Sequence, residues 1–139
     1  MSNMITVETT VNAPIEKVWE YWNNPEHIKY WAFASDDWEA PSAENDLKTG
    51  GKFKTRMQSK TDKTQGFDFG GTYTNVEERK VIEYTMDDGR KVSIHFDTAD
   101  DGQTKITESF DPESENSEEM QRSGWQAILN NFKKYTERN

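Results

Sequence analysis

Glu108 is the ionisable residue whose neighbours would best suit it to chemistry. It lies between Ile106 and Phe110, in a segment where apolar and polar residues alternate. A β-strand would turn these three side chains toward one face. A carboxyl group on an apolar face is partly desolvated, which raises its pKa. Glu108 is therefore the only candidate catalytic residue, as a general acid or base, or as a group that orients a ligand hydroxyl. A shift of register, or a polar partner at the strand end, would instead give it a structural role.

Two tyrosines and two histidines are the other candidates for chemistry. The alternation predicts that Tyr73 and Tyr84 project to the same face as Glu108, where each hydroxyl could bond a ligand or a backbone carbonyl. His27 and His95 have no second imidazole at metal-ligand spacing, so we expect no metal site. His95 also falls on the polar face, which excludes a Ser-His-Asp triad. Gly50-Gly51 lacks the Lys-Ser/Thr of a phosphate loop. We expect no cofactor.

The elements that must hold these residues are mostly strands. Alternation predicts strands at 4–11, 52–58, 67–74, 82–86, 92–97 and 105–110. Asp88-Gly89 and Asp101-Gly102 predict tight hairpin turns. Gly70-Gly71 predicts a bulge or a sharp bend. Trp38 is a candidate for a short strand, and 41–51 is expected to be a loop.

The helical patterns are two short ones and one long one. Val18 and Trp22 predict about two helical turns after Pro14. Asn24-Pro25 then suits the N-cap and first residue of a second short helix that runs to about residue 30. A long helix is predicted over about 115–138, with Met120, Gly124, Ile128 and Phe132 at intervals of four.

The distribution of apolar residues predicts a cavity. One face of the strands is polar and would meet water, whereas the other carries nearly all the strand aromatics. A helix is ~10–12 Å wide, and six or seven strands at ~4.8 Å spacing span roughly 30 Å. We therefore expect an α+β fold in which a curved six- or seven-stranded antiparallel sheet wraps the C-terminal helix and leaves an aromatic-lined space. The candidate lining residues are Trp22, Trp31, Phe33, Trp38, Phe53, Met57, Phe69, Tyr73, Tyr84, Phe96, Glu108, Met120, Gly124, Trp125 and Ile128.

Composition limits the classes of partner. The 139 residues suit a single domain over 1–139, and the formal net charge of -9 disfavours nucleic acid and anionic membranes. The chain has no cysteine, so disulfides and thiolate chemistry are excluded. It shows no signal-peptide pattern and no apolar run of membrane length, so we expect a cytoplasmic protein without membrane insertion. Both a monomer and a homodimer remain open.

Five motifs along the chain resemble those of one family. They are Val11-Asn-Ala-Pro-Ile-Glu-Lys-Val-Trp19, Asn24-Pro-Glu-His-Ile-Lys-Tyr-Trp31, Gly50-Gly-Lys-Phe-Lys-Thr-Arg-Met57, Gly71-Thr-Tyr-Thr-Asn-Val-Glu77 and Gly124-Trp-Gln-Ala-Ile-Leu129. In this order they resemble the START-like (SRPBCC) helix-grip superfamily, and within it the branch named after the activator of Hsp90 ATPase homologue. The resemblance implies a cavity for lipids, polyketides or other apolar molecules, sometimes with catalysis. It implies a chaperone partner only for a subset whose eukaryotic co-chaperones carry a separate N-terminal domain, and this chain shows none.

Three classes of function are compatible with these patterns. The favoured one is a module that binds a small apolar ligand without catalysis. The second is an enzyme of the cyclase or hydrolase type that uses Glu108. The third is a chaperone-interacting activator, which the polar outer face of the predicted sheet disfavours because a docking surface needs exposed apolar area.

Overall fold

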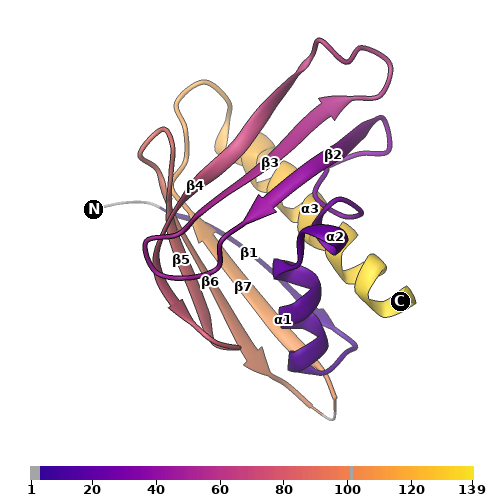
Figure 1. Cartoon of the computed structure of the whole chain (residues 1–139), viewed down its shortest axis with the longest axis vertical. Helices are drawn as coiled ribbons and strands as arrows, with labels where there is room; N and C mark the ends of the chain where they lie inside the picture. Colours follow the sequence, from indigo (N-terminus) through magenta and orange to yellow (C-terminus); the bar gives the residue numbers. More distant parts are fainter. Residues whose placement is uncertain (1–3, 101) are drawn as a thin grey trace.

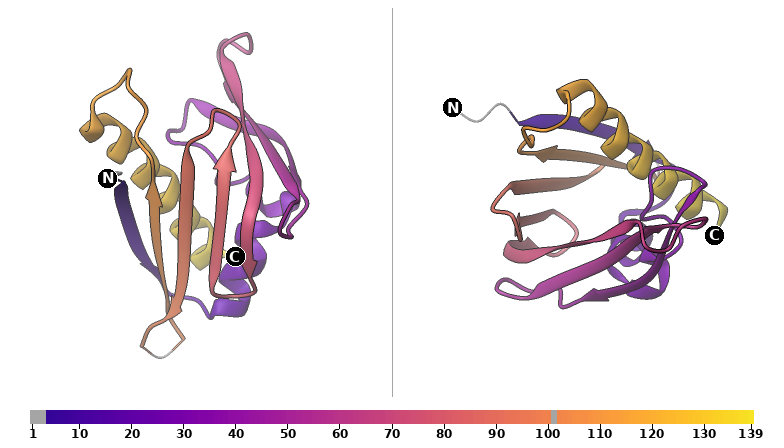
Figure 2. Two further views of the ribbon diagram at one scale, coloured as in Figure 1. Left: turned by 90° about the vertical axis from the view of Figure 1, so that its left-hand side faces the viewer. Right: turned by 90° about the horizontal axis from the view of Figure 1, so that it is seen from above.

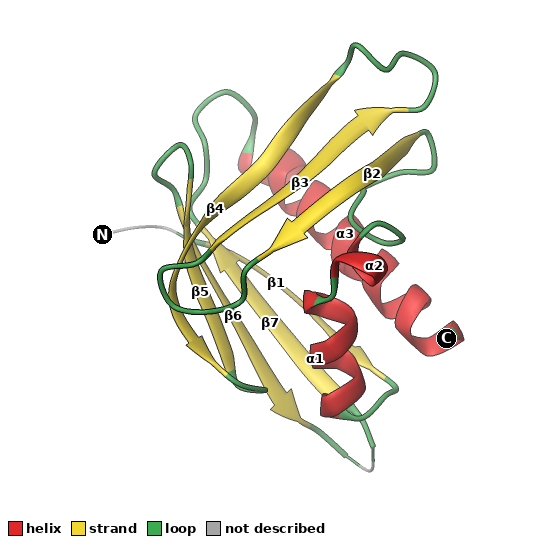
Figure 3. Cartoon of the chain, in the orientation of Figure 1, coloured by secondary structure: helices red, strands yellow, loops and turns green. Residues whose placement is uncertain are grey.

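The fold is a curled sheet that faces one long helix. The computed structural model describes residues 4–100 and 102–139, and in them the elements follow the order β-α-α, six further strands and a C-terminal helix (Figures 1 and 3). Their bounds are β1 Ile5–Val11, α1 Ile15–Asn23, α2 Pro25–Ile28, β2 Trp38–Asn45, β3 Lys52–Ser59, β4 Gly66–Glu77, β5 Val81–Met86, β6 Lys91–Thr98, β7 Thr104–Phe110 and α3 Glu118–Arg138.

The sheet has seven strands among the described residues, in the order β1-β7-β6-β5-β4-β3-β2, and every neighbouring pair is antiparallel. Seen from above, it curves round so that β2 to β4 lie opposite β1, with α3 across the open side (Figure 2). The backbone of α3 approaches β1 more closely than the rest of the sheet. The predicted α+β helix-grip fold, with a curved antiparallel sheet and two short helices after the first strand, is confirmed.

The segment expected to be a loop is partly a strand. β2 includes Pro41 and pairs with β3 on one side only, with a register irregularity between Glu39 and Ser42. Proline has no N–H to donate, so it is confined to edge strands and bulges. Pro41 occupies such a place, and the expected loop over 41–51 is therefore wrong for 41–45.

Caps set the beginnings of two helices. Asn24 Oδ1 accepts a hydrogen bond from the Glu26 N–H at 3.0 Å, and Pro25 is the first residue of α2, as predicted. The helix ends at Ile28, earlier than expected. Ser117 Oγ accepts from the Met120 N–H at 3.1 Å, which makes Ser117 the N-cap of α3. The predicted start at about residue 115 was too early because this cap was overlooked.

The end of the fold near α1 and α2 is packed with aromatic rings. Phe96 is buried and meets Trp19 and Trp22 edge-on, at centroid distances of 5.3 and 5.7 Å. Phe132 of α3 is fully buried against Trp22 and Trp31, at 4.8 and 5.0 Å. Edge-to-face contacts of this kind are favourable. They close this end of the space between the sheet and α3.

Glycines mark two turns and one close approach. Gly89 has φ +93° in the hairpin between β5 and β6, as Asp88-Gly89 predicts. Gly102 has φ +72°, while Asp101 of the second predicted turn lies outside the described residues. The expected bulge is not at Gly70-Gly71, because the irregularity in the pairing of β4 lies between Tyr73 and Asn75. A Cβ on Gly71 would instead lie 2.5 Å from the backbone oxygen of Thr85 on β5.

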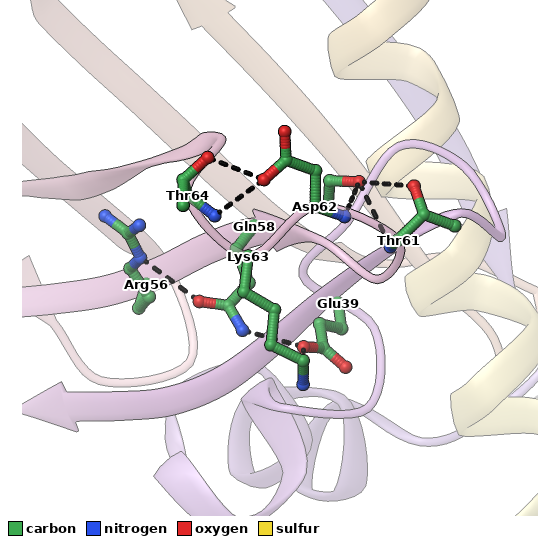
Figure 4. Close-up of polar contacts among 8 residues, drawn as sticks. Glu39, Arg56, Gln58, Thr61, Asp62, Lys63 and Thr64 are labelled. Atoms are coloured by element: carbon green, nitrogen blue, oxygen red, sulfur yellow. Dashed lines mark hydrogen bonds and ion pairs between the residues drawn. The ribbon is translucent and has the colours of Figure 1, made fainter.

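Polar contacts tie the edge strand to the β3–β4 hairpin (Figure 4). Gln58 Nε2 donates to Glu39 Oε2 at 2.7 Å, and Lys63 Nζ lies 3.4 Å from the same oxygen. The hydrogen bond from Gln58 lowers the pKa of Glu39 below its usual value. In the hairpin, Asp62 Oδ1 accepts from the N–H and the hydroxyl of Thr64, which lowers the Asp62 pKa. The contacts of Gln58 and Lys63 with Glu39 join the edge strand β2 to the β3–β4 hairpin, whereas the Asp62–Thr64 bonds lie within that hairpin.

Candidate functional site

A cavity of about 470 Å³ lies between the inner face of the sheet and α3. Its volume is within the range of roughly 300–1,000 Å³ typical of small-molecule sites. It forms because α3 lies nearest to β1, while β3, β4 and β5 curve away from the N-terminal half of the helix. Its apolar and aromatic lining residues are Trp22, Ile28, Trp31, Ala32, Phe53, Met57, Phe67, Phe69, Tyr73, Ile82, Tyr84, Met86, Ile94, Trp125 and Ile128.

Glu108 is part of the cavity wall. It lies on β7 between its antiparallel neighbours Val7 and Ile94, and only 6% of its surface is exposed. No hydrogen bond or ion pair joins its carboxyl group to another residue in the described part of the chain. Burial raises the pKa of Glu108 from its ordinary 4.5 to about 8. At neutral pH the cavity wall therefore holds a mostly protonated carboxyl group that no described residue bonds.

Tyr84 and Tyr73 lie in the same wall but have different surroundings. The hydroxyl of Tyr73 donates to Asn45 Oδ1 at 2.5 Å, and Asn45 Nδ2 donates to the Asn23 carbonyl at 2.7 Å. Tyr73 is thus held by the protein. Burial raises the pKa of Tyr84 well above its usual value, and the negative charge of ionised Glu108, which lines the same cavity, raises it further. Within residues 4–100 and 102–139 no side chain bonds the Tyr84 hydroxyl.

An aromatic cluster surrounds Tyr84. Phe53 meets it edge-on at 4.7 Å between centroids, and Phe69 lies at 6.3 Å. Trp125 of α3 meets Phe69 at 5.9 Å and stacks on Phe110 at 3.9 Å, so it bridges β4 and β7 across the space. The cavity is thus lined by ring faces and edges from both sheet and helix.

The cavity opens to solvent beside charged residues, because Asp87 and Asp88 of its lining are exposed and Arg90 and Glu113 are half-buried. Asp87, Asp88 and Arg90 come from the hairpin between β5 and β6, and Glu113 comes from the segment before α3. Arg90 Nε donates to Asp88 Oδ2 at 2.8 Å, so the two charges of this pair balance. Asp87 and Glu113 have no cationic partner among the described residues. The opening is therefore anionic.

The structure places ten of the fifteen predicted lining residues on the cavity wall. These are Trp22, Trp31, Phe53, Met57, Phe69, Tyr73, Tyr84, Glu108, Trp125 and Ile128. That a ligand contacts them remains a proposal.

The other five predicted residues lie elsewhere. Phe96 is buried against Trp19 and Trp22, and Met120 is 62% exposed on the first turn of α3. Trp38 lies beside Phe67 at 6.2 Å, and Phe33 lines a separate shallow pocket near the C-terminus. A Cβ on Gly124 would have no heavy atom within 4 Å, so no close approach requires glycine there. These five residues lie outside the cavity lining, and periodicity could not show this because it gives the face of an element and not what lies opposite each position.

Several polar lining residues were not predicted. Thr55 falls between Phe53 and Met57 on the inner face of β3, so the alternation would have found it. Asn45 was missed because its strand was expected to be a loop. Gln121 is buried and bonds the backbone of Glu113 and Asn116, which fixes the segment before α3. Its role could not be read from spacing, because its partners lie in irregular backbone.

The histidines do not contribute to the cavity. His27 stacks on Tyr21 at 3.9 Å between centroids, and its Nδ1 lies 2.6 Å from the Tyr135 hydroxyl. His95 is exposed on the outer face of β6, where its Nε2 lies 3.2 Å from Ser93 Oγ. The part of the chain that the structure describes contains no group of three or more potential metal ligands. None of its helices is both long and apolar enough to span a bilayer.

Comparison with known proteins identifies relatives of the whole fold. The structure is similar to the AHSA1-like protein from Aeromonas hydrophila, with 39% identity, a TM-score of 0.87, and 96% of this chain and 93% of that chain covered. It is similar to Chr148 from Cytophaga hutchinsonii, with 58% identity, a TM-score of 0.82, and coverage of 99% and 94%. Protein NE0264 from Nitrosomonas europaea, at 20% identity and a TM-score of 0.82 with coverage of 97% and 94%, shares the fold. No curated protein matches the chain.

The family model described as activator of Hsp90 ATPase homolog 1-like protein matches residues 12–137. That range includes α1, α2, six of the seven strands in full and nearly all of α3. It also includes every residue of the cavity wall. The chain therefore belongs to the activator of Hsp90 ATPase homolog 1-like family, within the START-like superfamily.

Proposed function

We propose that the protein binds a small, largely apolar molecule in the cavity between the sheet and α3. The observation that carries the proposal is the cavity itself, about 470 Å³ in volume and walled mainly by aromatic and aliphatic side chains. An apolar wall favours a guest because binding removes apolar surface of both partners from water. The few polar groups, Glu108 above all, would orient the guest.

The volume sets the size of the ligand. A water molecule occupies ~30 Å³ in the liquid, so the cavity corresponds to roughly fifteen water molecules. A ligand of about that many non-hydrogen atoms, with one or two polar groups, fits this space. A long acyl chain or a polymer would have to extend through the opening beside Asp87 and Glu113.

Native mass spectrometry and dye binding test this proposal directly. We expect freshly purified protein to carry a small molecule, or to enhance the fluorescence of the neutral apolar dye N-phenyl-1-naphthylamine. Thr55→Phe would place a ring in the cavity, because Thr55 is buried on β3 and lines it. It should weaken dye binding at least tenfold.

Lys52→Phe is the matched control, since Lys52 lies on the same strand but is exposed on the outer face. It should leave dye binding unchanged, and circular dichroism should show both variants folded. Equal dye binding by wild type and Thr55→Phe would place the dye outside the cavity. Absence of both a co-purified molecule and dye binding would contradict the proposed function.

Catalysis at Glu108 is a second candidate function, and a specific observation favours it. A buried carboxyl group with a pKa of about 8 can donate or accept a proton near neutral pH, as a general acid or base must. Once a ligand is identified, its turnover can be followed by mass spectrometry. If the wild type and Glu108→Gln convert it equally, Glu108 is not catalytic.

A further inference from the structure

The lack of a protein partner for Glu108 restricts the chemistry of the ligand. Glu108 is only 6% exposed as a residue, and it belongs to the wall of the cavity. A buried carboxyl group is usually bonded by the protein, because an unbonded one loses its hydration without replacement. None of the described residues bonds the Glu108 carboxyl group, so the group is available to form hydrogen bonds with a ligand in the cavity.

The rest of the lining favours a positive charge near Glu108. The faces of aromatic rings attract cations, and Tyr84, Phe53, Phe69 and Trp125 form a connected group of rings in the wall of the same cavity as Glu108. The titratable or charged lining residues are Asp68 and Tyr73 from β4, Tyr84 from β5, Asp87, Asp88 and Arg90 from the following hairpin, Glu108 from β7 and Glu113 before α3.

The single cation in that set is already balanced. Arg90 pairs with Asp88, and Asp68 lies 3.7 and 3.8 Å from the cationic groups of Lys54 and Arg56 on the outer side. Asp87 and Glu113 remain as net negative charge at the opening. A carboxylate or phosphate ligand would be repelled there and would meet another carboxyl group inside. A cation would be attracted on the way in.

We infer that the cavity takes a monocationic amphipathic ligand, an alkylamine or arylalkylamine, whose ammonium group pairs with the Glu108 carboxylate while its apolar body lies against the rings. This inference rests on the proposed function, which it deepens by naming the ligand class. The pairing is an acid–base step: Glu108 loses its proton to solvent, and the ammonium N–H groups donate to the resulting carboxylate.

The proton balance gives a measurable signature. With a Glu108 pKa of about 8, the group is about nine-tenths protonated at pH 7, so binding releases about one proton. Apparent affinity for an amine should rise about fiftyfold between pH 6 and pH 8 and then level off, because only the ionised group pairs with the ammonium. A ligand that accepts a hydrogen bond from protonated Glu108 would show the opposite trend.

Three probes of matched shape separate these cases: 4-phenylbutylamine, 4-phenylbutan-1-ol and 4-phenylbutanoate. Each is titrated into the 139-residue protein by displacement of N-phenyl-1-naphthylamine and by calorimetry in two buffers of different ionisation enthalpy. We expect the amine to bind more tightly than the alcohol at pH 8, on the order of tenfold to hundredfold for one charge-assisted hydrogen bond. We expect the acid to bind most weakly.

Glu108→Gln should abolish the preference for the amine over the alcohol and the proton release. The exposed control Glu44→Gln on β2 should change neither. The pair Asp87→Asn and Glu113→Gln should weaken amine binding at low salt more than at high salt. If the alcohol or the acid binds at least as well as the amine at pH 8, or if the preference survives in Glu108→Gln, the inference is wrong while the proposed function stands. If neither the dye nor any of the probes binds, both are wrong.

Discussion

The burial of Glu108 should cost the protein stability in a pH-dependent way. The folded carboxyl group has a pKa of about 8, against 4.5 in the unfolded chain. Between these values the folded chain holds a proton that the unfolded chain has lost. Stability therefore falls as the pH rises from about 4.5 to about 8, and is constant outside that window. Glu108→Gln replaces the group by a neutral amide of similar size and removes this dependence.

The magnitude follows from the two pKa values. One pH unit corresponds to about 1.36 kcal/mol, so the span of about 3.5 units between 4.5 and 8 amounts to roughly 5 kcal/mol above pH 8. At pH 7 the cost is roughly 3 kcal/mol. Tyr84 does not add to the trend, since its pKa is raised well above the range. At pH 5 the wild type and Glu108→Gln should differ by less than about 1 kcal/mol.

Urea unfolding at pH 5, 6, 7 and 8, followed by tryptophan fluorescence, measures the effect. The free energy of unfolding of Glu108→Gln should exceed that of the wild type by an amount that grows about 1.4 kcal/mol per pH unit above pH 5. Taking the difference cancels groups that titrate alike in both proteins. Glu44→Gln is the control, because an exposed carboxylate stays hydrated in both states. A difference that stays constant from pH 5 to pH 8 would refute the reasoning and indicate a well-hydrated carboxyl group.

Two further predictions concern the elements that shape the cavity. Gly71→Ala should destabilise the protein by about 2 kcal/mol or more, because the added Cβ would clash with the Thr85 backbone oxygen. Gly124→Ala should instead stabilise the protein by up to ~1 kcal/mol, because the added Cβ has no heavy atom within 4 Å and alanine favours a helix more than glycine does. Thermal unfolding of both variants tests the pair, and a loss at Gly124 equal to that at Gly71 would contradict it. Ser117→Ala removes the hydrogen bond to the Met120 N–H and should lower the free energy of unfolding by about 1 kcal/mol. Urea unfolding measures this loss of stability. An unchanged unfolding midpoint would show that the cap does not stabilise α3.

Some features were determined by the sequence alone, because they depend on neighbours a few residues apart. Alternation placed β1 and β3 to β7, and Asn24-Pro25 fixed the start of α2 through a local hydrogen bond. The side of the sheet that Glu108 faces also followed, because successive side chains of a strand point to opposite faces. The fold class followed from these elements and from the motifs shared with the family.

The tertiary structure decided what depends on distant residues. Pro41 is compatible with a strand only because β2 is the edge of the sheet. Phe96 and Phe69 both point inward, yet Phe96 is covered by Trp19 and Trp22 while Phe69 borders open space. Alternation predicts the face of the sheet to which a side chain points, but it does not predict which residues that side chain contacts. The cavity arises because α3 packs against one edge of a sheet that curves away from it, and for the same reason no described residue reaches the carboxyl group of Glu108.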